Sequence, residues 1–412
     1  MTSLLVRAAW VCPVAAPPLA DGWVLVEGGR IAAVGRGREA PPAGRVDDLG
    51  EVALLPGLVN AHTHLELSWL RGLVPPAADF LTWVGRLMAR RARLETADDE
   101  RTMAAMRDAL SAARATGTVA IGDVSNALVS PAVLREQGVA AVVFHEIVGF
   151  RDADGRTAAA AAAARAAAGS GGDVRVVPAA HAPFSVSAEL FTAIRDEVRR
   201  LDRPISSVHV GESPEEVMLL RTGQGPWRDR LHALGAWRDG WTPPGCGPAD
   251  YLCDLGVLEP GVLAVHGVQL TDAELARLAA AGVTLVTCPR SNAWVGVGAP
   301  PIARFLAAGV RLALGTDSLA SAPDLNLFGE LAALRALVPE VPARRLLAIA
   351  TQGGADGLQL GERFGALAPG REARLVAVTL PPGTTDPEEA LVHGVAAERI
   401  RVLTPVPAAM VP

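Results

Sequence analysis

Residues 56–64 read PGLVNAHTH, an apolar stretch that ends directly in two histidines. The apolar half favours a buried strand, because parallel strands that are covered on both faces are almost continuously hydrophobic. A doubly wound nucleotide-binding sheet would carry a glycine-rich phosphate loop after its first strand. Histidines at that point favour instead a parallel barrel, whose functional side chains follow the strand ends.

Strand-like and helix-like segments alternate after this stretch. The strand candidates are 56–62, 118–123, 139–145, 174–181, 205–209, 262–266, 283–288 and 311–316. Helix-like segments between them include 98–115, 187–200, 271–281 and 301–308. The alanine-rich run 157–168 predicts a further outer helix, because alanine has the highest helix propensity. The alternation predicts an α/β fold with a (β/α)₈ TIM-like barrel over residues 58–367.

Both ends of the chain are strand-rich. The segment GWVLVEGGRIAAVGRG (22–37) predicts a hairpin that turns at residues 27–29. Residues 368–380 and the tail through 405 show the same pattern, so we expect a small β-sandwich domain built from 1–57 plus 368–412. The stretch 223–250 is rich in Trp, Gly and Pro and interrupts the alternation. It fits an active-site loop or a dimer contact equally well.

The composition of the 412 residues, half of them hydrophobic, predicts a large buried core. A net charge of −6 argues against a nucleic-acid partner. No apolar run reaches the ~20 residues that span a bilayer, and the N-terminus lacks the tripartite pattern of a secretory signal. Scattered cysteines predict reduced thiols and a cytoplasmic location; they are Cys12, Cys246, Cys253 and Cys288.

The sequence contains no lysine, since all 38 basic residues are arginine. Schiff-base chemistry and a P-loop lysine are therefore excluded. A carbamylated lysine that bridges two metal ions in a barrel of this kind is excluded as well. Any metal site is accordingly expected to hold one ion.

Six of the eight histidines fall at or just beyond predicted strand ends, at positions 62, 64, 145, 181, 209 and 266. His62 and His64 are two residues apart, so their side chains share one face of the strand. Two imidazoles on that face can bind one metal ion. For His145 and His181 a structural role at the barrel rim remains an equal alternative.

Two carboxylates also follow strand ends. Glu212 comes three residues after His209, which suits a metal ligand beside a proton shuttle, although a helix N-terminus also favours a glutamate. Asp317 follows the last strand and can bind the metal and accept a proton from water, although it could instead cap a helix. His266 ends the strand VLAVH.

Taken together, these segments resemble the amidohydrolase superfamily, in its mononuclear aminohydrolase branch. The matching segments are PGLVNAHTHLELSWLRG (56–72), HAPFSVS (181–187), HVGE (209–212), VHGVQLTDAEL (265–275), CPRSNAWVGVG (288–298) and LGTDSLASAPDLNLFGEL (314–331). They occur in the family's order and span most of the predicted barrel. The family's composite terminal sandwich also matches the strand-rich ends.

The resemblance implies one divalent metal ion, zinc or alternatively iron, with four ligands: His62, His64, His209 and Asp317. Glu212 would be the acid and base that moves protons onto the leaving nitrogen. His266 would orient the attacking water, and Asp317 would also accept a proton from it. The residues implied to border the substrate are His181, Ser291 and Asn292.

The form HTHLELS is similar to aminodeoxyfutalosine deaminases of the alternative menaquinone pathway. This narrower resemblance implies that Glu66 and Ser68 shape a nucleoside pocket. Arg290 and Trp294 would suit a carboxylate and a stacked base, although Trp294 fits core packing equally well. The implied reaction converts 6-aminodeoxyfutalosine to futalosine and ammonia, with a small molecule as the partner and a possible homodimer by family analogy.

Other functions share most of these motifs. Relatives that act on S-adenosylhomocysteine, methylthioadenosine, guanine or chlorinated triazines remain alternatives, as does cleavage of an amide or a carbon–halogen bond. A non-catalytic barrel scaffold is a further alternative. It would have no need to keep the metal ligands together with Glu212 and His266.

Overall fold

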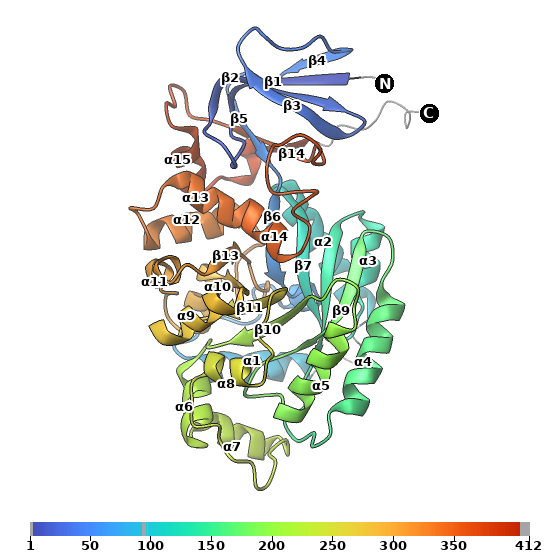
Figure 1. Cartoon of the computed structure of the whole chain (residues 1–412), viewed down its shortest axis with the longest axis vertical. Coiled ribbons are helices and arrows are strands. Elements are labelled where there is room, and N and C mark those ends of the chain that lie inside the picture. The colour runs from blue at the N-terminus through green and yellow to red at the C-terminus, as the bar shows by residue number, and fades with distance from the viewer. Residues whose placement is uncertain (1–2, 93–95, 97, 404–412) are drawn as a thin grey trace. The chain divides into compact units, whose positions relative to one another are not determined.

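The computed structural model describes residues 3–92, 96 and 98–403, and the chain divides into two compact units (Figure 1). The first unit comprises residues 1–60, 111–120 and 326–412, and the second comprises 61–110 and 121–325. None of the described helices combines the length and the apolar character needed to cross a bilayer. All four cysteines are free thiols.

A seven-stranded sheet in the first unit contains strands from both ends of the chain. Its order is β15-β14-β5-β1-β2-β3, with β4 paired to β1. The strands are β1 (Ser3–Val11), β2 (Leu19–Glu27), β3 (Arg30–Arg36), β4 (Arg45–Asp48), β5 (Val52–Pro56), β14 (Leu375–Thr379) and β15 (Ile400–Leu403). The predicted strand pattern through 405 is described as far as Leu403, and residues 404 and 405 lie outside the described residues. The packing of two sheets into a sandwich stays a prediction.

The predicted hairpin is confirmed, because β2 and β3 pair antiparallel and turn at Gly28 and Gly29. Both glycines have positive φ, 57° and 79°. This conformation is sterically unfavourable for residues with a Cβ. Buried side chains of the sheet pack together, among them Val6, Val24 and Leu375. The helical segments of this unit are α12 (Leu327–Leu337), α13 (Ala343–Ala348), η2 (Ile349–Gly353), α14 (Gly354–Gly357), α15 (Pro387–Val392) and η3 (Ala397–Arg399).

Eight further strands form two four-stranded sheets, in the orders β6-β7-β8-β9 and β10-β11-β12-β13. Their bounds are β6 (Leu58–Thr63), β7 (Thr118–Ser125), β8 (Ala140–Ile147), β9 (Val174–Ala180), β10 (Ser206–Val210), β11 (Val262–His266), β12 (Thr284–Thr287) and β13 (Arg311–Leu314). The pairs β8–β9, β10–β11, β11–β12 and β12–β13 run parallel. Every strand predicted for the middle of the chain is thus confirmed, with ends displaced by at most two residues.

Backbone hydrogen bonds link the edges of the two sheets. The N–H of His209 in β10 donates to the carbonyl of His181, just beyond β9, at 2.9 Å. The N–H groups of Thr316 and Asp317, just beyond β13, both donate to the carbonyl of His62 in β6 at 3.1 Å. These bonds bring the strand ends that carry the predicted site residues next to one another.

Helices follow most of these strands. They are η1 (Leu65–Leu70), α1 (Phe80–Arg91), α2 (Glu100–Ala115), α3 (Ser130–Glu136), α4 (Arg156–Gly169), α5 (Ala188–Arg199), α6 (Pro214–Thr222), α7 (Pro226–Ala233), α8 (Pro248–Asp254), α9 (Asp272–Ala281), α10 (Pro289–Val295) and α11 (Ile302–Ala307). Local sequence explains several starts, since Ser187, Ser213 and Thr271 accept backbone hydrogen bonds as N-caps. The predicted interruption at 223–250 contains α7 and the start of α8.

An apolar cluster in the second unit centres on aromatic side chains. Phe80 and Trp83 of α1 belong to it, together with Phe184 and Trp227. The rings of Phe184 and Trp227 stack with centroids 4.1 Å apart and planes 15° apart. Such pairs contribute about 0.5–1.5 kcal/mol beyond their area burial, so this stack stabilises the cluster.

Candidate active site

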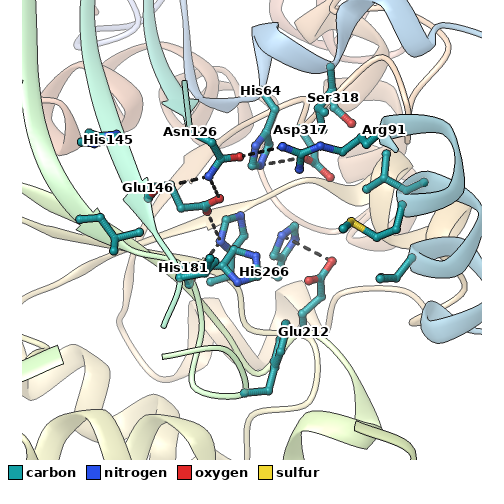
Figure 2. A pocket seen from close by; sticks show the side chains of 18 of the residues that line it. His64, Arg91, Asn126, His145, Glu146, His181, Glu212, His266, Asp317 and Ser318 are labelled. Atoms are coloured by element: carbon teal, nitrogen blue, oxygen red, sulfur yellow. Dashed lines mark hydrogen bonds and ion pairs between the residues drawn. The ribbon is translucent and has the colours of Figure 1, made fainter. Parts of the chain in front are cut away.

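A cavity of about 800 Å³ lies in the second unit, where strand ends meet (Figure 2). Its polar wall comes mostly from residues at or just after successive strands. These residues are His64, Asn126, His145, Glu146, His181, His209, Glu212, His266, Asp317 and Ser318. Because these residues come from several distant parts of the sequence, the cavity exists only once the strands have assembled.

Four predicted metal ligands converge beside this cavity. Ring nitrogens of His62, His64 and His209 lie within 4.8 Å of one another. Oδ1 of Asp317 lies 3.4 Å from Nε2 of His64 and 3.8 Å from Nε2 of His62. Three imidazoles and a carboxylate facing one point fit a site for a divalent metal ion.

The environment of His62 tests this fit. Its side chain is buried, and within the described part of the chain neither ring nitrogen has a hydrogen-bond partner. Burial, reinforced by His64 and His209, lowers the pKa of His62 well below its usual value, so the ring is neutral. A buried imidazole without partners is costly. A metal ion would satisfy it, because metals bind the neutral form.

Asp317 is held by hydroxyl groups on one side only. Its Oδ2 accepts hydrogen bonds from the hydroxyls of Ser291 (2.6 Å) and Ser321 (2.9 Å). Burial works to raise the pKa of Asp317, but the rings of His64 and His266 outweigh it, so the pKa is lowered. The carboxylate therefore stays charged, and its other oxygen, Oδ1, faces the histidines.

Glu212 and His266 form a second pair at the cavity. Oε1 of Glu212 lies 3.5 Å from Nε2 of His266, as Figure 2 shows. Burial, together with the charges of Asp317 and Glu216, raises the pKa of Glu212 well above its usual value. This shift favours the protonated form of Glu212, which a general acid requires.

The backbone is in the left-handed region at two of these site residues. His266 has φ 76° and Asp317 has φ 57°, and neither is a glycine. Such conformations persist only where the surrounding structure imposes them, and they gather at functional sites. Asn292 helps to hold one of them, because its side-chain amide lies 3.1 Å from Nδ1 of His266.

Sequence reasoning missed Glu146 and Asn126. Oε1 of Glu146 lies 3.4 Å from Nδ1 of His209, and its Oε2 accepts a hydrogen bond from Nδ2 of Asn126 at 2.9 Å. Although burial favours a higher value, His181, His209, His64 and Asn126 lower the pKa of Glu146 to about 2. The ionised carboxylate therefore orients the imidazole of His209, a common arrangement behind metal ligands.

A second group of ligand-type atoms, from Glu146, His181 and His209, also lies within 4.8 Å. Nδ1 of His209 lies 3.1 Å from the carbonyl oxygen of His181, besides its contact with Glu146. This leaves Nε2 of His209 for the group with His62. The geometry fits one metal ion with a supporting carboxylate behind it.

The sequence pattern of the amidohydrolase family matches residues 53–405. The chain belongs to the amidohydrolase family. It is accordingly a hydrolase that acts on carbon–nitrogen bonds other than peptide bonds. The resemblance that the sequence motifs indicated is thereby confirmed.

Relatives of this amidohydrolase carry the names of deaminases. Aminodeoxyfutalosine deaminase of Deinococcus radiodurans is 33% identical over 351 residues, which cover 81% of this chain and 80% of the relative. The 5-methylthioadenosine/S-adenosylhomocysteine deaminase of Moorella thermoacetica is 28% identical over 396 residues, covering 92% and 86%. Among solved structures, an adenosine deaminase from Xanthomonas campestris with bound zinc has a TM-score of 0.79 at 28% identity, covering 97% of this chain and 91% of that chain.

The predicted substrate residues of this amidohydrolase fall into two groups. His181 lines the cavity, with Nδ1 2.5 Å from the hydroxyl of Ser185. Ser291 and Asn292 lie behind the cavity wall, where they contact Asp317 and His266. They support the site through other side chains.

The other predicted substrate residues do not line the described wall. The carboxylate of Glu66 accepts hydrogen bonds from the N–H groups of residues 126, 127 and 129, so it holds the loop after β7. Ser68 is buried in η1. Arg290 donates to Asp324 at 2.9 Å, and Nε1 of Trp294 donates to the carbonyl of Val74 at 3.1 Å. Other parts of the protein thus occupy the polar groups of Glu66, Arg290 and Trp294.

His145 is a cavity residue that lies apart from the metal cluster in Figure 2. Its Nδ1 lies 3.3 Å from the carbonyl oxygen of Ser125. Adjacent residues of a strand point to opposite faces, so only one of His145 and Glu146 can face the metal ligands. In the structure Glu146 is the residue that faces them. The alternation of side chains along the strand was the signal in the sequence that could have indicated this.

Proposed function

We propose that this amidohydrolase is a metal-dependent hydrolytic deaminase of adenine-type nucleosides, which converts 6-aminodeoxyfutalosine to futalosine and ammonia. The observation that carries the proposal is the convergence of four metal-ligand side chains beside a cavity that also contains Glu212 and His266. The names of the Deinococcus and Moorella relatives support a nucleoside substrate. The cavity of about 800 Å³ also leaves room for a substituent beyond the base and sugar.

The ligand set fits zinc, with iron as the alternative, since both accept imidazole and carboxylate. His62, His64, His209 and Asp317 would hold the ion. When bound, it would supply a Lewis acid that lowers the pKa of water from 15.7 to about 7, which makes a nucleophile available at neutral pH. Oδ1 of Asp317, the oxygen that faces the histidines, would accept the proton of the attacking water.

Glu212 would donate its proton to the ring nitrogen next to the carbon that carries the amino group. This transfer favours addition of water at that carbon. The carboxylate that remains can then take up the second proton of the added water and pass it to the departing ammonia. His266, 3.5 Å from Glu212, would donate from Nε2 to the developing oxyanion. A donor in such a position typically contributes on the order of 3 kcal/mol to transition-state stabilisation.

We also infer that the eight strands close into one (β/α)₈ barrel spanning 58–367, with 1–57 and 368–412 forming a composite β domain. The bonds from His209 to His181 and from Asp317 to His62 support closure, because they join both pairs of sheet edges. The terminal sheet, which contains β1 and β15, supports the composite domain.

Ammonia release from purified protein tests the function. Glu212→Gln should lower kcat at least roughly a hundredfold while metal content stays unchanged, since the amide carries no transferable proton. Glu189→Gln serves as the control, because Glu189 lies on α5, pairs with Arg238 and does not line the cavity. Elemental analysis should find one zinc or iron per chain. A metal-free protein, or a Glu212 variant with the wild-type rate, would refute the proposal.

The substrate is tested by comparing kcat/KM for aminodeoxyfutalosine, methylthioadenosine, S-adenosylhomocysteine and adenosine. The highest value is expected for aminodeoxyfutalosine. A higher value for methylthioadenosine or S-adenosylhomocysteine would transfer the assignment to the activity named for the Moorella relative, which matches over a longer stretch.

A further inference from the structure

Four hydrogen-bond donors from the loop after β7 converge on the carboxylate of Glu66. They are the hydroxyl of Ser125 and the backbone N–H groups of residues 126 (3.0 Å), 127 (3.1 Å) and 129 (3.2 Å). A carboxylate has about four sites for accepting hydrogen bonds, so these donors saturate it. Glu66 therefore fixes the course of this loop.

The backbone of the loop is strained. Leu128 has φ 61°, in the left-handed region, although it is not a glycine. Its N–H group donates to Oγ of Ser125 at 2.9 Å, and the same hydroxyl donates to Glu66. Such a conformation persists only where the surrounding structure imposes it. The loop therefore depends on the carboxylate of Glu66 for its shape.

The loop presents Asn126 to Glu146. Nδ2 of Asn126 donates to Oε2 of Glu146 at 2.9 Å and to the backbone carbonyl of Glu146 at 3.3 Å. Nη2 of Arg91 donates to Oδ1 of Asn126 at 3.4 Å, which determines which end of the amide faces Glu146 (Figure 2). Oε1 of Glu146 is thereby directed towards His209, 3.4 Å from its Nδ1.

A buried aspartate ties the start of this chain of contacts to the same strand. Oδ1 of Asp123 in β7 accepts a hydrogen bond from the N–H of Leu65 at 2.8 Å. Leu65 lies between His64 and Glu66, and Asp123 is fully buried. The backbone that carries Glu66 therefore keeps its place relative to the loop that its carboxylate binds.

We propose that Glu66 and Asn126 are positioning residues for the metal ligand His209. They act through the carboxylate of Glu146, and neither is a proposed ligand of the ion. Glu66 shapes the loop and the loop places the amide of Asn126. The amide aims Glu146 at Nδ1 of His209, which leaves Nε2 for the metal. The inference rests on the metal site of the proposed function, and it gives Glu66 a role other than contact with the substrate.

Zinc dissociation constants, measured by competition with a chelator of known affinity, test this chain of contacts. Asn126→Ala and Glu66→Gln should each weaken zinc binding roughly tenfold, the lower end of the effect of losing a group behind a metal ligand. In Glu66→Gln an NH₂ group faces N–H donors, so the loop loses part of its support. Combining either change with Glu146→Gln should add little, because both act through that carboxylate. Effects that multiply in full would overturn the inference.

Asn126→Asp separates positioning from packing. The aspartate has nearly the same shape, but it places an oxygen where the amide donated to Glu146. Zinc binding should weaken at least as much as in Asn126→Ala, because two acceptors with like charge repel each other. Wild-type affinity in Asn126→Asp would show that only the volume of the side chain matters, and it would overturn the inference.

The visible absorption of the protein loaded with cobalt(II) gives a readout without turnover, because it depends on the arrangement of the ligands around the ion. The bands should change in Asn126→Ala and in Glu66→Gln, whereas a loss of stability alone would leave them as they are. Glu100→Gln is the matched control, since Glu100 is exposed and pairs with Arg107. It should keep the wild-type bands and zinc affinity. Wild-type bands in both site variants would contradict the positioning role.

Kinetic measurements at saturating zinc separate this inference from the proposed function. A raised KM for aminodeoxyfutalosine in Glu66→Gln, with unchanged zinc affinity, would indicate contact with the substrate. That result would overturn the inference while the deaminase function stands. Weakened zinc binding in the Glu66 and Asn126 variants, without ammonia release from any nucleoside by the wild type, would refute the function and keep the positioning role.

Discussion

The two ring nitrogens of His209 have different surroundings, and this difference decides how the residue can act. Nδ1 lies near the carboxylate of Glu146 and the carbonyl of His181, and both oxygens can accept a hydrogen bond from a protonated Nδ1. The ring is therefore held in the tautomer that leaves Nε2 as the basic nitrogen. A single carboxylate behind the ring thus orients His209 for its proposed role as a metal ligand.

Glu146→Gln should weaken metal binding roughly 10- to 100-fold, the usual effect of losing such a supporting carboxylate. The amide can offer Nδ1 only a neutral acceptor, and it can also turn its NH₂ group towards the ring. Competition with a chelator of known affinity measures the change. Glu136→Gln is the matched control, since Glu136 pairs with Arg107 at an exposed position. Equal metal affinity in wild type and Glu146→Gln would rule out the supporting role.

The turn between β10 and α6 fixes the position of Glu212. Gly211 has φ 60°, and a Cβ at this position would lie 2.5 Å from a methyl carbon of Leu270. The carboxylate of Glu216 accepts hydrogen bonds from the N–H groups of Gly211 (3.0 Å) and Glu212 (2.9 Å). The first turn of α6 therefore folds back on the end of the strand and holds the proposed general acid.

The stability of this turn should depend on pH through Glu216. Burial outweighs its backbone hydrogen bonds and raises its pKa from 4.5 to about 7. The folded protein therefore keeps a proton that the unfolded chain loses, so the contribution is fully present below pH 4.5 and is lost as the pH rises to about 7.

In the wild type the free energy of unfolding should decrease between pH 4.5 and 7. In Glu216→Gln this decrease should be smaller, by up to about 1.4 kcal/mol per pH unit. Denaturant titrations at pH 5 and 7 measure the two slopes. Glu215→Gln, one position earlier on the same helix, should keep the wild-type slope. A wild-type slope in Glu216→Gln would contradict the assignment.

Local sequence predicted the helix α4 but not that one side of it lines the cavity. Its alanine content indicated an outer helix, and the structure confirms a helix at Arg156–Gly169. Which side of it lines a cavity depends on the strands and helices packed around it. An alanine-rich helix has no marked apolar face of its own, so its sequence could not reveal the face that ends in Arg165.

The proposed metal ligands would tie together segments that are far apart in the chain. They come from the ends of β6, β10 and β13, and so from positions 62 to 317. A ligand that binds only the folded state stabilises it, by about 2.7 kcal/mol at a hundred times its dissociation constant. Loss of the ion should therefore weaken the assembled strands.

Removal of the metal by chelation should lower the melting temperature by on the order of 5 °C, and readdition of zinc should restore it. Differential scanning fluorimetry measures the shift. In His62→Ala the chelator should have little further effect, whereas His393→Ala, which alters an exposed histidine paired with Glu389, should respond like the wild type. A wild-type melting temperature that chelation does not change would argue against a structural contribution of the ion.

Short-range patterns carried most of the successful predictions. Strand positions followed from apolar runs bounded by polar residues, and family motifs such as HVGE (209–212) placed Glu212 beside His209. Two residues that were expected to meet the substrate lie away from the described cavity wall for one reason. Arg290 and Trp294 lie next to the site in sequence, but their polar groups bond Asp324 and Val74. Proximity along the chain does not fix the direction of a side chain.

The order of residues alone determined the alternation of strands and helices, the family and the types of side chain available for catalysis, because these depend on local periodicity and on chemical identity. Only tertiary structure decided which of these side chains share a cavity. Glu146, Asn126, Arg91 and Arg165 line one cavity because strands and helices distant in sequence pack together. Hydrogen bonds from Asn126 to Glu146 and from Arg91 to Asn126 fix the orientation of three of them.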